Sequence, residues 1–151
     1  MARPYYSTVF EQTADQVWNA IRAFGSYEWA GGVSESHMED GKADDAAGGI
    51  RSFRYGGERM RQRLLAHSDL DRFYTFDLCD PSPMRDYQAT LRVTPIIDGK
   101  RAFVEWWATF DCAADEYDQW MTFLEQDGFP KWLESLRTVL AMEASTASQV
   151  Q

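Results

Sequence analysis

The sequence contains little cysteine, little histidine and no long apolar run. Two cysteines and two histidines occur in 151 residues, without the C-x-x-C spacing of a zinc or redox site and without a disulfide framework. We therefore expect neither a metal nor a cofactor. Every apolar run is shorter than the roughly 20 residues needed to cross a bilayer, and residues 1–10 lack the apolar centre of a signal peptide. The sequence predicts a reduced, cytoplasmic protein with no membrane span.

Positive charge is also scarce. Fifteen Lys and Arg against 24 Asp and Glu give a formal net charge of -9. A domain this acidic repels phosphate backbones, so we expect no nucleic-acid partner. Apolar residues are abundant at 44%, with 15% aromatics, and this excludes a disordered chain. The length fits one domain, which we place at residues 1–143, followed by a disordered tail at 144–151.

The residue pattern changes from strand to helix and back along the chain. A short aromatic strand at 4–10 precedes the capping box Thr13-Ala14-Asp15-Gln16, which starts a helix that Gly25 ends. A second short helical turn is expected at 27–29. Alternating patterns then predict six strands joined by short turns, which makes them antiparallel neighbours. These strands are expected at 33–39, 50–55, 58–67, 73–79, 87–94 and 101–111.

A long amphipathic helix follows from about residue 117. Gly128 and Pro130 lie inside its apolar pattern. Because proline removes a helix hydrogen bond, we expect a kink or a restart there, with Pro130 in a first turn. The simplest way to bury all the apolar faces is a curved sheet that closes around this last helix.

Alternation along the strands predicts which side chains point inward. The inward sets are mostly large and apolar, which suits a solid core as well as a cavity. Three polar members, Tyr55, Gln62 and Tyr87, favour a cavity, since buried polar groups need partners that a ligand or water supplies. Arg51 shares this phase with Phe53 and Tyr55, yet we expect it to form an ion pair with the acidic exterior.

Several segments together resemble a known family. They are the stretch from Phe24 to Val33, Asp40-Gly41, Gly49-Ile50-Arg51, Gln62-Arg63-Leu64-Leu65 with Asp69, the stretch from Tyr87 to Pro95, Val104-Glu105-Trp106 and Thr109-Phe110-Asp111. In order and spacing they resemble the polyketide cyclase/dehydrase group of the START/Bet v 1-like (SRPBCC) superfamily. The resemblance covers nearly the whole chain.

This resemblance implies an α+β helix-grip fold in the order β-α-α-β6-α. In that fold a seven-stranded antiparallel sheet wraps around a long C-terminal helix and leaves a ligand pocket between them. Carried over by position, with Tyr74 added by strand phase, the expected ligand-binding residues are Trp29, Phe53, Tyr55, Met60, Gln62, Tyr74, Phe76, Leu78, Tyr87, Ala89, Trp106, Leu124, Gly128 and Trp132.

The chain departs from the family pattern at two places. Relatives often have glutamate where this chain has Gln62, and Trp-His-Pro where it has Trp29-Ala30-Gly31. A carboxylate and an imidazole are therefore missing near the expected pocket. If the protein is an enzyme, its catalytic residues would be Tyr87, Tyr55 and Gln62, with the tyrosines acting as general acids or polarising a carbonyl.

Three functions remain open at this point. The first is binding of a small, largely apolar molecule, such as a polyketide, isoprenoid, aromatic compound or lipid. The second is a cofactor-independent cyclase or dehydratase that folds such a substrate and uses the cavity tyrosines. The third is a partner-binding module or homodimer, because Phe103 and Trp107 point outward on an otherwise polar strand face.

Overall fold

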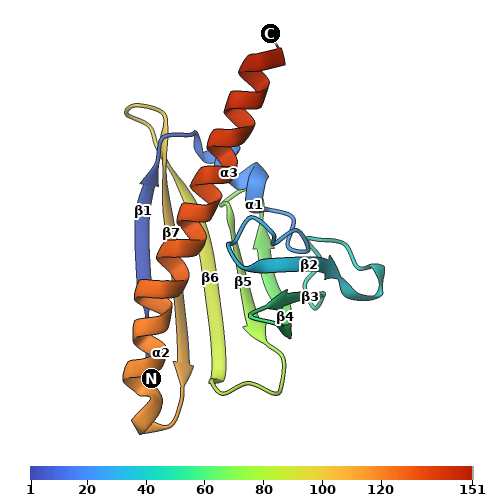
Figure 1. Cartoon of the computed structure of the whole chain (residues 1–151), viewed down its shortest axis with the longest axis vertical. Coiled ribbons are helices and arrows are strands. Elements are labelled where there is room, and N and C mark those ends of the chain that lie inside the picture. The colour runs from blue at the N-terminus through green and yellow to red at the C-terminus, as the bar shows by residue number, and fades with distance from the viewer. Residues whose placement is uncertain (151) are drawn as a thin grey trace.

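A single seven-stranded antiparallel sheet and a long C-terminal helix make up the fold (Figure 1). The computed structural model describes residues 1–150, and the side chains of residues 1–146. The strands follow the order β1-β7-β6-β5-β4-β3-β2, which confirms the predicted fold. Their bounds are β1 Tyr5–Phe10, β2 Val33–Met38, β3 Ile50–Tyr55, β4 Glu58–Ser68, β5 Phe73–Leu78, β6 Arg85–Ile96 and β7 Arg101–Asp111.

The first helix, α1 (Ala14–Ile21), begins at the predicted capping box. The Thr13 hydroxyl accepts a hydrogen bond from the Gln16 backbone N–H at 3.2 Å, and the Gln16 side chain accepts one from the Thr13 N–H at 2.9 Å. The predicted second helical turn is only a turn, in which the Ala30 N–H donates to the Tyr27 carbonyl at 3.0 Å. It does not extend into a helix, because Gly32 takes a φ of 88°.

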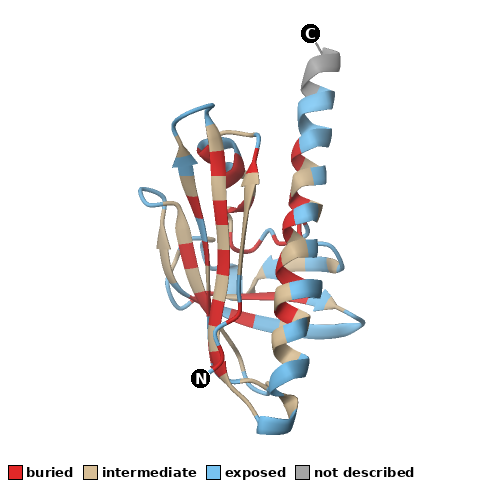
Figure 2. Ribbon diagram, turned by 90° about the vertical axis from the view of Figure 1, so that its left-hand side faces the viewer, coloured by how far each residue is buried: buried red, intermediate tan, exposed pale blue. Residues whose placement is uncertain are grey.

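Burial alternates along the long strands, as Figure 2 shows by its banded colouring. In β7 every second residue from Ala102 to Phe110 is buried and the residues between are half-buried. The inward sets of β4, β5 and β6 also follow the predicted phase. A bulge between Leu64 and Ala66 shifts the register of β4 against β5. The concave face of the sheet therefore carries the core.

The C-terminal helical segment has three parts. The helix α2 (Tyr117–Thr122) leads into the π-helical turn η3 (Phe123–Gly128), and α3 (Phe129–Val150) follows. Pro130 stands in the first turn of α3, as predicted. The backbone stays helical at Phe129, with φ of -51° and ψ of -49°, so the change before Pro130 is the π-helical turn η3 and the helix does not restart. The helix continues past residue 144, where the sequence predicts a disordered tail, and residues 141–146 are exposed. Figures 1 and 2 show that α3 extends beyond the end of the sheet.

The two outward aromatics of β7 are partly covered. Phe103 and Trp107 are half-buried, and the ring of Tyr5 stacks on Trp107 with 6.5 Å between centroids. The Tyr5 hydroxyl also donates to Glu105 at 2.6 Å, so β1 shields this part of the outer face. The homodimer remains a prediction. Within the described residues, no helix is both long and apolar enough to span a membrane.

Candidate functional site

A cavity of about 440 Å³ lies between the concave face of the sheet and the C-terminal helical segment. This volume falls in the usual range for small-molecule pockets, about 300–1,000 Å³. Strands β2 to β6 form one side, and α2, η3 and α3 form the other. The loop at 79–84, between β5 and β6, also contributes to the wall. The strands thus supply one wall of the cavity, and the helical segment around the π-helical turn η3 supplies the facing one.

Many of the predicted ligand-binding residues border this cavity. They are Phe53, Tyr55, Met60, Gln62, Leu78, Tyr87, Leu124 and Trp132. Their side chains alternate along β3 to β6 or share one face of the helical segment, as the sequence predicts.

The other predicted residues do not border the cavity. They are Trp29, Tyr74, Phe76, Ala89, Trp106 and Gly128, and all are buried in the core. At the strand positions among them, side chains from other elements pack directly on the sheet. The ring of Phe24 lies 5.5 Å from that of Tyr74, and Phe129 stacks on Trp106 at 5.1 Å. They therefore lie in the solid part of the core.

Sequence reasoning missed several lining residues. They are Tyr27, Val33, Trp120, Phe123, Pro81, Ser82, Pro83 and Met84, together with charged residues at the rim. Tyr27 belongs to an irregular turn, where no periodicity shows direction. The prolines mark a loop, but the sequence does not show that this loop folds over the cavity. The aromatic content of the segment around residue 27 is the one available signal.

The most unusual group beside the cavity is Arg51, whose side chain is fully buried. Its Nε and Nη2 donate to the side-chain oxygen of Gln62 at 2.8 and 2.6 Å, and its Nη1 donates to the Phe24 carbonyl at 3.1 Å. The guanidinium also lies over the rings of Tyr27 and Phe24, 3.6 and 4.0 Å from their centroids. The expected ion pair with the exterior is therefore wrong, because the side chain points into the core.

Arg51 fixes the orientation of the Gln62 amide. A guanidinium only donates hydrogen bonds, so the Gln62 atom that receives two of them must be the amide oxygen. The amide nitrogen, Nε2, makes no hydrogen bond to any residue that the structure describes. Gln62 borders the cavity, and Nε2 is left as a free donor there.

Two phenols, Tyr27 and Tyr87, also border the cavity. Burial raises the pKa of each, and the Arg51 guanidinium partly opposes that rise. The neighbouring Tyr27 phenol raises the pKa of Tyr87 further. Both hydroxyl groups therefore stay protonated at neutral pH and can donate hydrogen bonds. Burial raises the pKa of Tyr74 as well, but its hydroxyl lies in the core without a hydrogen-bond partner.

Charged groups of both signs form the rim of the cavity. Among the described lining residues the carboxylates are Glu58 and Asp80, both exposed. Arg59 donates to the Ser52 hydroxyl, and Arg61 forms an ion pair with Glu39 at 2.7 Å. The two carboxylates at the rim match the two arginines in number, whereas the Gln62 amide and the Tyr27 and Tyr87 phenols lie deeper in the lining, beside the buried Arg51.

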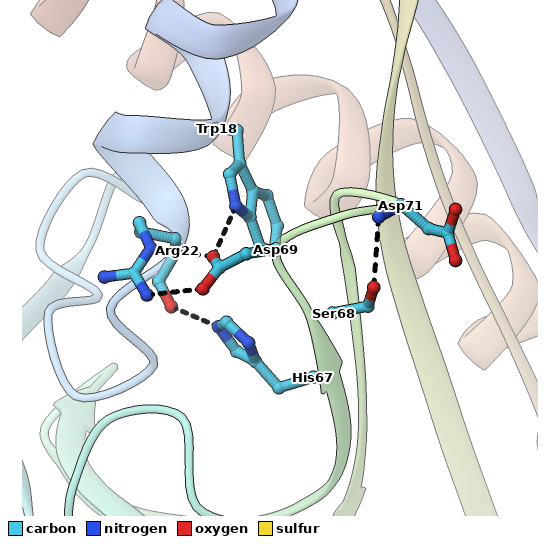
Figure 3. A network of polar contacts seen from close by, with 6 residues as sticks. All are labelled: Trp18, Arg22, His67, Ser68, Asp69 and Asp71. Carbon is cyan, nitrogen blue, oxygen red and sulfur yellow. Dashed lines mark hydrogen bonds and ion pairs between the residues drawn. The ribbon is translucent and has the colours of Figure 1, made fainter.

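A second polar network lies at the C-terminal end of α1, separate from the hydrogen bonds of Arg51 and Gln62 (Figure 3). Asp69 accepts hydrogen bonds from the Trp18 indole and from Arg22, each at 2.8 Å, and these lower the pKa of its carboxyl group. His67 bonds to the Arg22 carbonyl at 2.8 Å. This network holds α1 to the turn between β4 and β5, and none of its residues borders the cavity.

The described residues contain no cluster of three or more His, Cys, Asp or Glu side chains arranged to hold a metal ion. Cys79 borders the cavity, but burial raises the pKa of its thiol, which disfavours the thiolate that a nucleophile requires. The chemistry available inside the cavity is therefore hydrogen-bond donation to a ligand oxygen.

A sheet wrapped around a C-terminal helix, with a cavity between them, defines a helix-grip protein of the Bet v 1-like class. The sequence matches the family described as "Polyketide cyclase / dehydrase and lipid transport" over residues 1–144. The chain belongs to this family, which confirms the resemblance seen in the sequence. No curated protein sequence matches it.

Solved structures with the same fold include both bacterial and plant proteins. A Thermobifida fusca protein has 24% identity and a TM-score of 0.82, over 94% of this chain and 95% of its own. XoxI from Bacillus cereus has 21% identity and a TM-score of 0.79, over 93% and 96%. Norcoclaurine synthase from Thalictrum flavum, solved with dopamine and hydroxybenzaldehyde, has 10% identity and a TM-score of 0.72, over 93% and 87%. At these identities the likeness shows the fold alone.

Proposed function

We propose that this protein binds a small, largely apolar molecule that carries at least one oxygen. The observation that supports this function is the 440 Å³ cavity, with its largely apolar lining and with donors on Gln62, Tyr27 and Tyr87 that make no hydrogen bond within the part of the chain that the structure describes. A cavity of this composition holds a ligand by apolar burial and orients it by a few hydrogen bonds.

A cavity-filling substitution tests this function. The substitution is made at Leu78, which borders the cavity and is half-buried. The probe is N-phenyl-1-naphthylamine, a neutral apolar dye whose fluorescence rises in apolar surroundings. We expect one dye per chain in the parent protein, and binding at least about tenfold weaker in Leu78→Trp because the indole occupies the space.

The matched control is Leu70→Trp, since Leu70 is 86% exposed in the turn between β4 and β5. It adds the same indole outside the cavity and should bind the dye as the parent does. If Leu78→Trp does not fold, Val33→Phe narrows the same cavity from β2. A parent that binds no dye, or cavity variants that bind it as tightly as the parent, would contradict the proposal.

The second candidate function is a cofactor-independent cyclase or dehydratase. It is favoured by the same free donors, because hydrogen bonds from Gln62, Tyr27 and Tyr87 could stabilise negative charge that develops on a substrate oxygen. Tyr55 borders the cavity as well, with its ring 5.9 Å from that of Trp132. In this function, catalysis would depend on hydrogen-bond donors to the substrate oxygen. The lining carboxylates lie at the exposed rim, and the amide of Gln62 cannot act as a base.

A further inference from the structure

The buried charge of Arg51 has no charged partner within the described residues. Arginine keeps its positive charge in proteins, and none of the ion pairs in the described part of the chain includes Arg51. Its acceptors are a neutral amide and a backbone carbonyl. The aromatic faces of Tyr27 and Phe24 stabilise the cation, but they carry no net charge. The interior therefore keeps one uncompensated positive charge.

Gln62 transmits this charge to the cavity. Its oxygen accepts two N–H groups of Arg51, which polarises the amide and turns Nε2 away from the guanidinium. The free N–H groups on the cavity side are thereby strengthened as donors. A glutamate at this position would neutralise Arg51 and present only acceptors. The residue type at position 62 thus decides the sign of the local potential.

The two phenols belong to the same electrostatic cluster. The Arg51 guanidinium joins Tyr27 to Gln62, because it lies 3.6 Å from the Tyr27 ring centroid and donates to the Gln62 oxygen. The register of the sheet sets Gln62 opposite Leu78, and Asp77 opposite Gln88, so Leu78 separates Gln62 from Tyr87 across neighbouring strands. Gln62, Tyr27 and Tyr87 all border the same cavity. A ligand oxygen that reaches Nε2 of Gln62 therefore meets phenol donors in the same part of the cavity. Three donors and a nearby cation make a site for negative charge.

We propose that the cavity selects small apolar molecules that carry a carboxylate, whose oxygens bind Nε2 of Gln62 and the hydroxyls of Tyr27 and Tyr87. The inference rests on the proposed binding function and adds the charge of the ligand. The charge on Arg51 supplies the preference, and the phenols and amide supply the hydrogen bonds. The whole chain carries a formal net charge of -9, so the preference for an anion arises inside the cavity and opposes the net charge of the protein.

A matched pair of ligands tests the charge preference. The pair is 2-naphthoate and 2-naphthamide, which share ring system and carbonyl group and differ in charge. The affinity of each compound is measured by titration, as the concentration that displaces N-phenyl-1-naphthylamine from the parent protein. We expect naphthoate to bind at least about tenfold more tightly than naphthamide, as a unit charge one side chain away in a buried site predicts. Equal affinities, or tighter binding of the amide, would overturn the inference.

Two variants separate charge from hydrogen bonding. Gln62→Glu pairs Arg51 with a carboxylate, and Arg51→Gln removes the charge while it keeps the Gln62 donors. Both should reduce the naphthoate preference, which is the ratio of naphthoate to naphthamide affinity within the same variant, to about twofold or less. An unchanged preference in either folded variant would overturn the role of Arg51. The control is Arg63→Gln, which removes an exposed arginine that pairs with Asp77 at 3.3 Å, and it should keep the preference.

The dye separates the two proposals. If the parent fails to bind N-phenyl-1-naphthylamine, the proposed binding function is wrong. If the parent binds the dye but does not prefer naphthoate, the binding function stands and the charge selectivity is wrong.

Discussion

At the scale of single residues, the site depends on which atom of Gln62 faces the cavity. The Arg51 side chain takes the amide oxygen through two hydrogen bonds of 2.8 and 2.6 Å. The same contact changes the expected effect of Gln62→Glu on neutral ligands. Considered alone, a new buried carboxylate would weaken their binding, because an unpaired charge in an apolar site is costly. Here Arg51 would form an ion pair with the new carboxylate, so Gln62→Glu should mainly lower the affinity for anionic ligands.

Tyr87→Phe tests the hydroxyl as a hydrogen-bond donor. Because burial raises the pKa of Tyr87, the phenol is protonated at neutral pH and the substitution removes one donor. We expect naphthoate affinity to fall about fivefold, the value of one hydrogen bond of about 1 kcal/mol, while binding of the neutral dye changes less than twofold. If the protein catalyses a reaction, turnover should fall about 100-fold.

Tyr74→Phe is the matched control for Tyr87→Phe. Its side chain is also buried, but Tyr74 does not border the cavity, and its hydroxyl makes no hydrogen bond within the described residues. Displacement titrations should show parental affinity for naphthoate in this variant. Equal losses in both variants would mean that the effect comes from general loosening of the core and that Tyr87 does not contact the ligand.

At the scale of elements, the π-helical turn η3 shapes the cavity wall. It carries Phe123 and Leu124, which border the cavity, and ends at Gly128. A Cβ on Gly128 would meet the Trp132 indole at 3.0 Å and the Phe123 carbonyl oxygen at 3.3 Å. Glycine at this position therefore lets the indole of Trp132 pack closely against the turn, which leaves space on its cavity side.

Gly128→Ala should push the Trp132 indole toward the cavity. We expect dye affinity to fall about threefold, a change of under 1 kcal/mol. The free energy of unfolding should change by less than about 1 kcal/mol, because alanine's helix propensity offsets the contact. Dye titration and urea denaturation measure the two quantities. The control is Gly31→Ala, whose Cβ would meet only Ser135 at an ordinary 3.5 Å. Parental dye affinity in Gly128→Ala would show that Trp132 does not move into the cavity.

At the scale of the whole molecule, the alternating pattern determines the faces of the sheet but not the depth of each position. Side chains of Leu78 and Ala89 both point inward, yet Leu78 borders the cavity and Ala89 lies in solid core. The difference depends on how far the helical segment stands from the sheet at each point, and local sequence does not encode that distance. The sequence predicts a change in the helix near Pro130, because proline acts locally on the backbone. It does not predict that the turn before Pro130 is π-helical.

The misplaced residue of greatest consequence is Arg51. The alternation along β3 places the Arg51 side chain on the inward face. Arginine is rarely buried without a charged partner, so the sequence alone predicts an ion pair with the acidic exterior. The actual acceptors are the Gln62 amide and the Phe24 carbonyl. They come from a neighbouring strand and from the segment after α1, and only the folded chain brings them together.

In the proposed complex, the cavity holds the ligand with its anionic oxygen at Gln62. The most direct measurement is a crystal structure of the protein with 2-naphthoate. We expect the ring between the sheet and η3, with a carboxylate oxygen within about 3.2 Å of Nε2 of Gln62. A naphthoate whose carboxylate points to solvent at the rim, or one bound outside beside Tyr5 and Trp107, would contradict it.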